Sequence, residues 1–99
     1  MKLRTRARSI ALQVLYEVDI ANHLPGDVLK LRLEELPLPE HLSEFSRKII
    51  FGVLPLTSNL DLLISKYAPE WPLDQIAAID RNILRIALWE FAVFHETPI

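Results

Sequence analysis

The stretch IDRNILRIALWEFAVF at residues 79–94 decides the fold. From residue 83 onward only Arg85 and Glu90 are polar, so a helix over this stretch is apolar nearly all round. Such a helix is typical of the middle of a core, and we expect other helices to surround it. Because only residues 95–99 follow, the far side of this helix needs cover from elsewhere.

The rest of the sequence has the spacing of amphipathic helices, with apolar residues recurring at three- and four-residue steps. No segment alternates as a strand does, so the fold class is all-α. Prolines divide the chain into about five expected helices. These cover residues 5–22, 28–36, 39–67, 73–78 and about 80–94.

Two positions predict how individual helices begin or bend. Asp27 is the expected N-cap of the second helix. Pro55 lies inside the third, where it cannot donate a backbone hydrogen bond and costs about 3 kcal/mol in an unbroken helix. We therefore expect a kink between Gly52 and Ser58.

Composition argues for one soluble domain without an active site. Of the 99 residues, 51% are hydrophobic and 24% charged, which is enough for one core. The absence of cysteine excludes disulfides and thiolate chemistry, and two glycines exclude a glycine-rich phosphate loop. The histidines His23, His41 and His95 lack the spacing of metal ligands. We expect no enzyme, no cofactor, no metal, no membrane span and a cytoplasmic location.

Charge is distributed unevenly along the chain. The first sixteen residues contain four basic and no acidic residues, whereas the remainder contains seven basic and thirteen acidic residues. Cations at a helix N-terminus are disfavoured by about 0.3 to 1 kcal/mol each. Such a cluster suits a phosphate backbone that wraps the helix tip, although a solvated terminus is the alternative. We call this cluster the basic collar; it consists of Lys2, Arg4, Arg6 and Arg8.

The first helix also carries a second apolar line. Leu12, Tyr16 and Ile20 lie about 160° from its core stripe. Two apolar lines on one helix imply that two different elements pack against it. Either the helix is packed on both sides, or Tyr16 faces a partner or stacks on a base.

Three ordered motifs resemble the NusB family of bacterial transcription factors. RTRARSIALQVLY at residues 4–16 is similar to the family's basic opening, and IDRNILRIALWEF at residues 79–91 is similar to its most recognisable run. Between them, Phe45, Gly52 and Val53, followed by Leu60, Asp61 and Ile64, match the long third helix. Thr97 and Pro98 fit the turn that follows.

This resemblance implies an all-helical domain over residues 1–99, with one subdomain at 1–67 and an incomplete one at 68–99. It implies a factor that binds the single-stranded boxA RNA of ribosomal RNA operons. Its partners would be NusE, a small-subunit ribosomal protein, and the antitermination complex of RNA polymerase. By motif position, the basic collar matches the RNA-binding start, with Lys2 a weaker extension. Tyr16 and Asp80 match residues at the NusE surface.

Three features depart from the family pattern. Pro55 falls within the third helix, and Trp89 stands where a tyrosine is usual. The family's last two helices are missing, so we expect a C-terminally truncated chain that forms a homodimer, or swaps segments, through residues 80–94, or is poorly stable alone. A monomer in sedimentation with an ordinary thermal transition would contradict this.

Two other functions fit the same residues. A NusB-like domain also forms the N-terminal RNA-binding part of certain ribosomal RNA cytosine-5 methyltransferases. Alternatively, the chain is a helical interaction domain whose basic collar binds nothing. Charge reversal at the three arginines of the collar without loss of RNA affinity would favour the second alternative.

Overall fold

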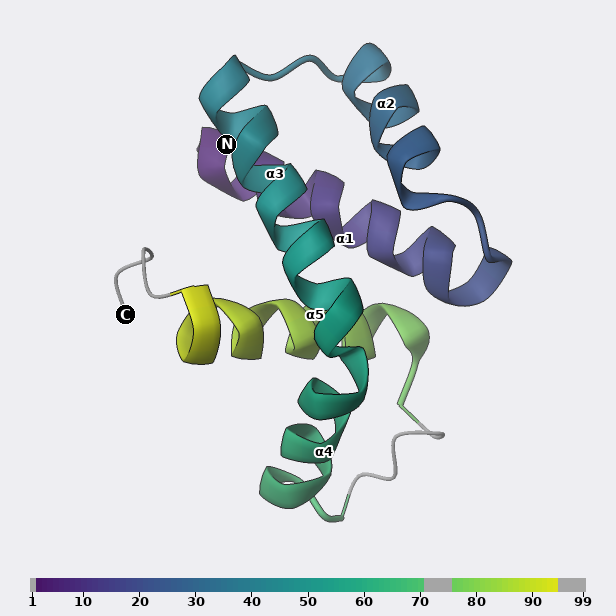
Figure 1. Ribbon diagram of the computed structural model, residues 1–99, viewed down its shortest axis with the longest axis vertical. Coiled ribbons are helices and arrows are strands. Elements are labelled where there is room, and N and C mark those ends of the chain that lie inside the picture. Colours follow the sequence, from purple (N-terminus) through teal and green to yellow (C-terminus); the bar gives the residue numbers. More distant parts are fainter. Residues whose placement is uncertain (1, 71–75, 95–99) are drawn as a thin grey trace.

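The computed structural model describes residues 2–70 and 76–94, and every regular element in these ranges is helical. The all-α prediction is therefore confirmed for the described residues (Figure 1). The α-helices are α1 Leu3–Ala21, α2 Pro25–Glu35, α3 Glu40–Val53, α4 Thr57–Tyr67 and α5 Ala78–Trp89. The 3₁₀ helix η1 Leu54–Leu56 joins α3 to α4, and the π-helical turn η3 Glu90–Phe94 continues α5.

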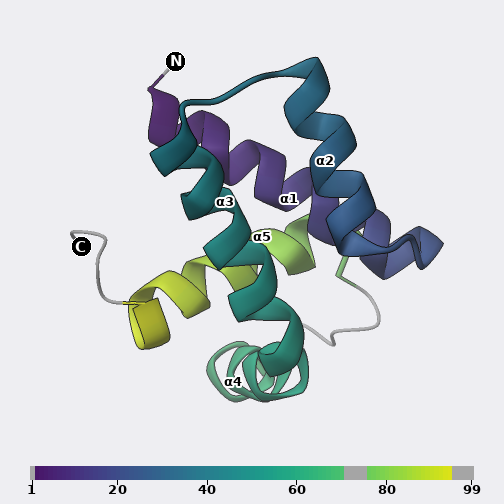
Figure 2. The ribbon, with the colours of Figure 1, turned by 45° about the horizontal axis from the view of Figure 1, so that its top comes forward.

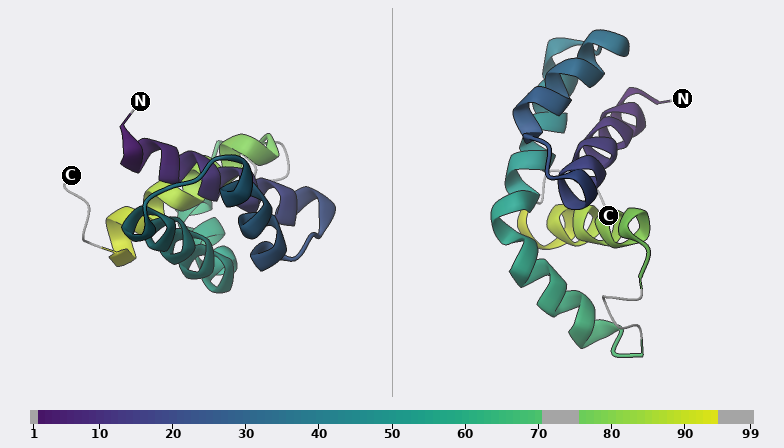
Figure 3. Two further views of the ribbon diagram at one scale, coloured as in Figure 1. Left: turned by 90° about the horizontal axis from the view of Figure 1, so that it is seen from above. Right: turned by 90° about the vertical axis from the view of Figure 1, so that its right-hand side faces the viewer.

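The helices form two layers. In the right-hand view of Figure 3, α2, α3 and α4 follow a curve, and α1 and α5 lie against one side of it. The view in Figure 2 shows α3 crossing both α1 and α5. Among the described elements, none covers the opposite side of α1 and α5. One side of this helix pair is therefore not covered by any described helix.

Close packing of α1 against α3 forms the centre of the core. Ala7 and Ala11 are fully buried on α1, and their small side chains let α3 approach closely. The hydroxyl of the buried Ser46 on α3 donates a hydrogen bond to the carbonyl oxygen of Ala7 at 2.8 Å. The contact thus leaves this buried hydroxyl with an acceptor, as burial requires.

The start of α2 differs from the prediction. Asp27 is not its N-cap, because α2 begins at Pro25, with Leu24 as the preceding residue. Proline is favoured at the first helical position, where its missing N–H would have no partner in any case. Asp27 instead lies in the first turn, where a carboxylate interacts favourably with the helix dipole.

The predicted break at Pro55 is confirmed. α3 ends at Val53, the 3₁₀ helix η1 contains Pro55, and α4 begins at Thr57. The Thr57 hydroxyl donates to the carbonyl oxygens of Leu54 at 3.0 Å and Val53 at 3.3 Å. The Thr57 side chain thus provides a hydrogen-bond donor for backbone carbonyl groups at the break.

The last helix is buried on one side and exposed on the other, in agreement with the expectation that its far side needs cover from elsewhere. Asn82 and Arg85 are its polar buried residues, whereas Ile83 and Phe91 are 46% and 60% exposed. The helix also begins two residues earlier than expected, at Ala78. Of the short helix expected over 73–78, residues 73–75 lie outside the described part of the chain.

By length and composition alone, the helical segment Glu40–Tyr67 could cross a membrane, because an eighteen-residue window within it has a mean hydropathy of 1.4. This segment was not expected to qualify. The core helix of a soluble protein passes the same test. Here the segment is interrupted at Pro55, and its buried residues include Ile49, Ile50 and Leu60 of the common core.

Gly52 on α3 lies directly against the indole of Trp89 on α5. A Cβ atom at residue 52 would lie 2.4 Å from the indole carbons Cε2 and Cζ2. Because Trp89 is 95% buried, the ring has little room to move. The absence of a side chain at Gly52 is therefore what allows the large ring at residue 89.

We predict that Gly52→Ala lowers the free energy of unfolding by about 1 to 3 kcal/mol, because the added methyl overpacks the core. Urea denaturation followed by circular dichroism measures this. Gly26→Ala is the matched control, since nothing lies within 4 Å of its added Cβ. Equal stability of the two variants would contradict the prediction.

Candidate nucleic-acid interface

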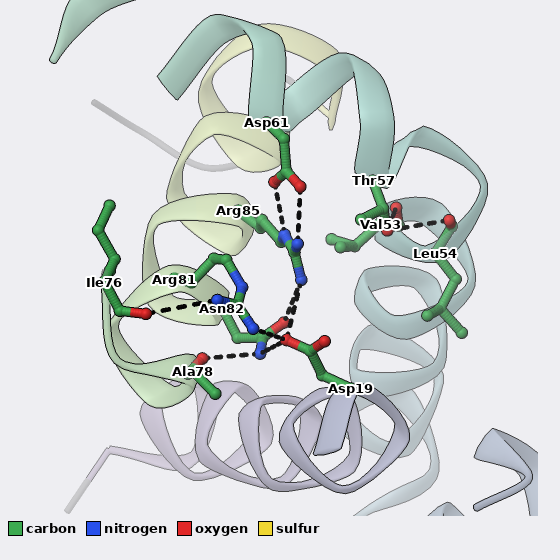
Figure 4. Close-up of polar contacts among 10 residues, drawn as sticks. All are labelled: Asp19, Val53, Leu54, Thr57, Asp61, Ile76, Ala78, Arg81, Asn82 and Arg85. Atoms are coloured by element: carbon green, nitrogen blue, oxygen red, sulfur yellow. Dashed lines mark hydrogen bonds and ion pairs between the residues drawn. The ribbon is translucent and has the colours of Figure 1, made fainter. Parts of the chain in front are cut away.

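A buried network of charges fixes α5 against α1 and α4. Arg85 donates from Nε to Asp61 Oδ1 at 2.7 Å and from Nη2 to Asp61 Oδ2 at 2.8 Å (Figure 4). Its Nη1 donates to Asp19 at 3.3 Å. Arg81 and Asn82 donate to the same Asp19 oxygen at 2.8 and 3.1 Å. One arginine of α5 therefore binds carboxylates of two other helices.

The network changes the ionisation of its members. Burial raises the pKa of Asp19, but hydrogen bonds from Arg81 and Asn82 and the positive charges of Arg81 and Arg85 outweigh it, so the pKa is lowered overall. The hydrogen bonds to Asp61 raise the pKa of Arg85. Both groups are therefore held in their charged forms.

The two ends of α1 and α5 meet in antiparallel order. Arg8 near the start of α1 binds Glu90 at the end of α5, and Asp19 near the end of α1 binds Arg81 near the start of α5. Figure 1 shows the two helices running in opposite directions. The start of α1, which carries the basic collar, therefore lies beside the last turn of α5.

The basic collar is only partly brought together. Lys2, Arg4 and Arg6 are exposed or half-buried at the start of α1. The guanidinium carbons of Arg4 and Arg8 lie 4.3 and 5.5 Å from the centroid of the Phe45 ring, so these two side chains project to the same side, as helical spacing predicts. Arg8 is also tied to Glu90.

A shallow groove of about 270 Å³ runs between α1 and α5 on their open side. We call it the α1–α5 groove. It begins beside the collar, because Arg8 and Glu90 are among its lining residues. Its other lining residues are Thr5, Ser9, Leu12, Ile83, Ile86 and Ala87.

The two predicted partner-binding residues extend the line of this groove. Tyr16 is half-buried and lies one turn beyond Leu12 on α1, whereas Asp80 is exposed and lies one turn before Ile83 on α5. Helical spacing places each near the face that lines the groove. Helical spacing therefore predicts the collar and these two residues towards opposite ends of the α1–α5 pair.

Sequence reasoning missed Phe45 and Glu90 as neighbours of the collar. Neither position is unusual in its own segment, because Phe45 continues an apolar stripe and Glu90 is one acid among thirteen. The ion pair joins residues 82 positions apart. Only the antiparallel packing of the first and last helices brings them together.

No metal site is found among the described side chains, which include His23 and His41. No group of three or more histidine, cysteine or carboxylate residues there could hold an ion. His23 instead lies 3.2 Å from Glu17. His95 lies outside the described residues.

Comparison with known proteins gives consistent matches over the whole chain. The protein-family model described as "NusB family" matches residues 5–99 of this chain. The transcription antitermination protein NusB of Roseiflexus sp. (strain RS-1) is 44% identical over 99 residues, which cover 98% of this chain and 70% of that protein.

Solved structures give the same result. The crystal structure of antitermination factors NusB and NusE in complex with double-stranded RNA contains a similar chain, with a TM-score of 0.83 and 26% identity. The match covers 98% of this chain and 71% of that one. The solution structure of NusB from Aquifex aeolicus matches with a TM-score of 0.76 and 27% identity. That match covers 99% of this chain and 66% of the Aquifex chain.

We predict that Asp19→Asn lowers the free energy of unfolding at pH 7 by about 1 to 3 kcal/mol, because Arg81 and Arg85 lose a charged acceptor. Since folding lowers the pKa of Asp19, its contribution is complete above the unfolded value of about 3.9 and is lost as the pH falls below it. The difference between wild type and variant should therefore persist to about pH 4 and close below it.

Urea denaturation between pH 2.5 and pH 7 tests this prediction. Glu34→Gln, a change of the same charge at an exposed position of α2, is the control. A difference between wild type and Asp19→Asn that stays constant down to the lowest pH would contradict it.

Proposed function

The chain belongs to the NusB family, and we propose that it is a transcription antitermination factor that binds boxA-type RNA together with NusE. The observation that carries the proposal is the antiparallel contact of α1 and α5. It brings Arg8 of the basic collar to one end of the α1–α5 groove, and helical spacing predicts Tyr16 and Asp80 towards the other end. One continuous surface can thus bind RNA and a protein side by side.

The collar supplies what an unpaired RNA backbone needs. Lys2, Arg4 and Arg6 present positive charge at the exposed N-terminus of α1, where the helix dipole adds to it. Contacts to phosphate fix position and affinity, whereas bases are read by stacking and by hydrogen bonds to their edges. The collar therefore accounts for affinity, and the groove beside it is where sequence preference would arise.

The relatives support an adaptor rather than an enzyme. The proteins matched above are named as antitermination factors, and this chain spans about 70% of the length of the Roseiflexus protein. The alternative, an N-terminal domain of a ribosomal RNA cytosine-5 methyltransferase, gains no support from them. Contact with the RNA polymerase antitermination complex, a homodimer through residues 80–94 and a cytoplasmic location stay predictions.

We predict that the chain binds a single-stranded boxA-type RNA more tightly than a scrambled RNA of equal length. Arg6→Ala should weaken the binding of both RNAs and reduce the slope of log K against log[salt] by about 0.7, the value for one phosphate contact to a single strand. Fluorescence anisotropy across a salt series measures both effects.

Two comparisons keep this experiment decisive. Lys30→Ala removes the same charge from an exposed position of α2 and should leave the slope unchanged. A boxA duplex distinguishes single-stranded from double-stranded recognition. Equal affinity for boxA and scrambled RNA, or equal slopes for Arg6→Ala and Lys30→Ala, would contradict the proposal.

We predict that Tyr16→Ala and Asp80→Lys each weaken NusE binding by about tenfold or more, the loss typical of a central interface residue. Neither change should alter the salt slope for RNA. Isothermal titration calorimetry with purified NusE measures the affinity. Tyr67→Ala, at an exposed tyrosine of α4, and Asp27→Lys, in the first turn of α2, are matched controls. NusE affinities that match those of the controls would remove these residues from the interface.

A further inference from the structure

Arg8 is not a free cation of the collar. Its Nε donates to both carboxylate oxygens of Glu90, at 2.9 and 3.2 Å, and its Nη2 donates to Oε1 at 2.9 Å. The side chains are 32% and 11% exposed. This paired geometry is the strong form of an arginine–carboxylate contact, so Glu90 holds Arg8 in one place.

Phe45 restricts the same guanidinium from a second direction. The guanidinium carbon of Arg8 lies 5.5 Å from the centroid of the Phe45 ring. The guanidinium carbon of Arg4 lies 4.3 Å from the same centroid. Phe45 is 95% buried and therefore a fixed support. Arg4 and Arg8 thus lie over the same ring, and Arg8 also lines the α1–α5 groove.

The ion pair with Glu90 offsets the positive charge of Arg8 but leaves part of its guanidinium able to donate hydrogen bonds. No hydrogen bond among the described residues uses Nη1 of Arg8, so its two N–H groups can donate to a phosphate oxygen. A phosphate that approaches Arg8 nevertheless meets a carboxylate bonded to the same guanidinium. Long-range attraction therefore comes from Lys2, Arg4 and Arg6, and Arg8 adds a directed donor.

We propose that Glu90 is a specificity-determining residue, which suppresses binding to arbitrary RNA by neutralising Arg8 while holding it for one correctly placed phosphate. This inference rests on the proposed RNA-binding function. Sequence-independent RNA affinity follows the number of phosphates that cations neutralise. A neutralised Arg8 lowers that affinity, whereas an RNA whose backbone passes Nη1 retains the hydrogen bond.

The proposal fixes the electrostatics of the wild-type chain and of Glu90→Gln. With three effective cations, the slope of log K against log[salt] for a single-stranded RNA is about −2, and with four it is about −3. Glu90→Gln keeps the shape of the side chain and removes its charge, so the slope should become steeper by about 0.7. At 0.1 M salt this corresponds to about fivefold tighter binding of an arbitrary RNA.

The experiment measures anisotropy of a twelve-residue oligouridine and a boxA-type RNA of equal length over a salt series. The proteins are wild type, Glu90→Gln, the double variant Glu90→Gln with Arg8→Gln, and Glu35→Gln. The double variant replaces a neutral ion pair by a neutral pair, so its slope should return to the wild-type value. Glu35→Gln removes a carboxylate that pairs with Arg32 on α2, and its slope should equal that of wild type.

The outcomes separate the proposals. A steeper slope for Glu90→Gln that the second substitution abolishes, with a reduced preference for boxA, supports the role of Glu90. If the ion pair is purely structural, Glu90→Gln lowers the thermal transition temperature and leaves the slope unchanged, which would overturn the inference. Absence of oligouridine binding by both wild type and Glu90→Gln would also overturn it. Equal wild-type affinity for both RNAs contradicts the proposed function and, with it, the specificity role of Glu90, whereas the slopes still test separately whether Glu90 neutralises Arg8.

Discussion

The buried guanidinium of Arg85 is the contact on which the arrangement of the helices depends. An arginine that is 93% buried requires partners, because removing its charge from water costs several kcal/mol. Asp61 of α4 binds it through two hydrogen bonds, and Asp19 of α1 binds it through a third. Apolar contacts alone tolerate sliding between helices, whereas these directed bonds do not. The position of α5 along α1 is therefore fixed, and with it the alignment of every residue pair across the α1–α5 groove.

The open side of α1 and α5 combines fixed and accessible parts. At one end, Phe45 and Glu90 hold the guanidinium of Arg8, so little conformational entropy remains for this side chain to lose on binding. At the other end, Asp80 is exposed and Tyr16 is half-buried. A rigid scaffold with exposed ends suits an adaptor, because two ligands can bind one surface without rearranging the core.

The sequence predicts local structure well, because periodicity and proline act over a few residues. The helical class, the break at Pro55 and the shared direction of Arg4 and Arg8 all follow from spacing along one segment. The burial of Arg85 does not, since its partners lie 24 and 66 positions away and nothing in the sequence identifies them. The start of α2 differs from the prediction because the preference of proline for the first turn outweighs that of aspartate for the N-cap. Four cations were visible at the N-terminus, but the carboxylate that neutralises one of them was not.

The separation of 82 positions between Arg8 and Glu90 determines when the proposed RNA-binding end can form. α1 can pack on α2 and α3 as soon as these neighbours are synthesised, because they follow it directly along the chain. The Arg8–Glu90 contact instead closes a loop of 82 positions, and such long-range contacts form late and slowly. During synthesis, the nascent chain therefore exposes Arg8 without its counter-charge until Glu90 has been made. The basic collar thus presents a different electrostatic surface before and after that point.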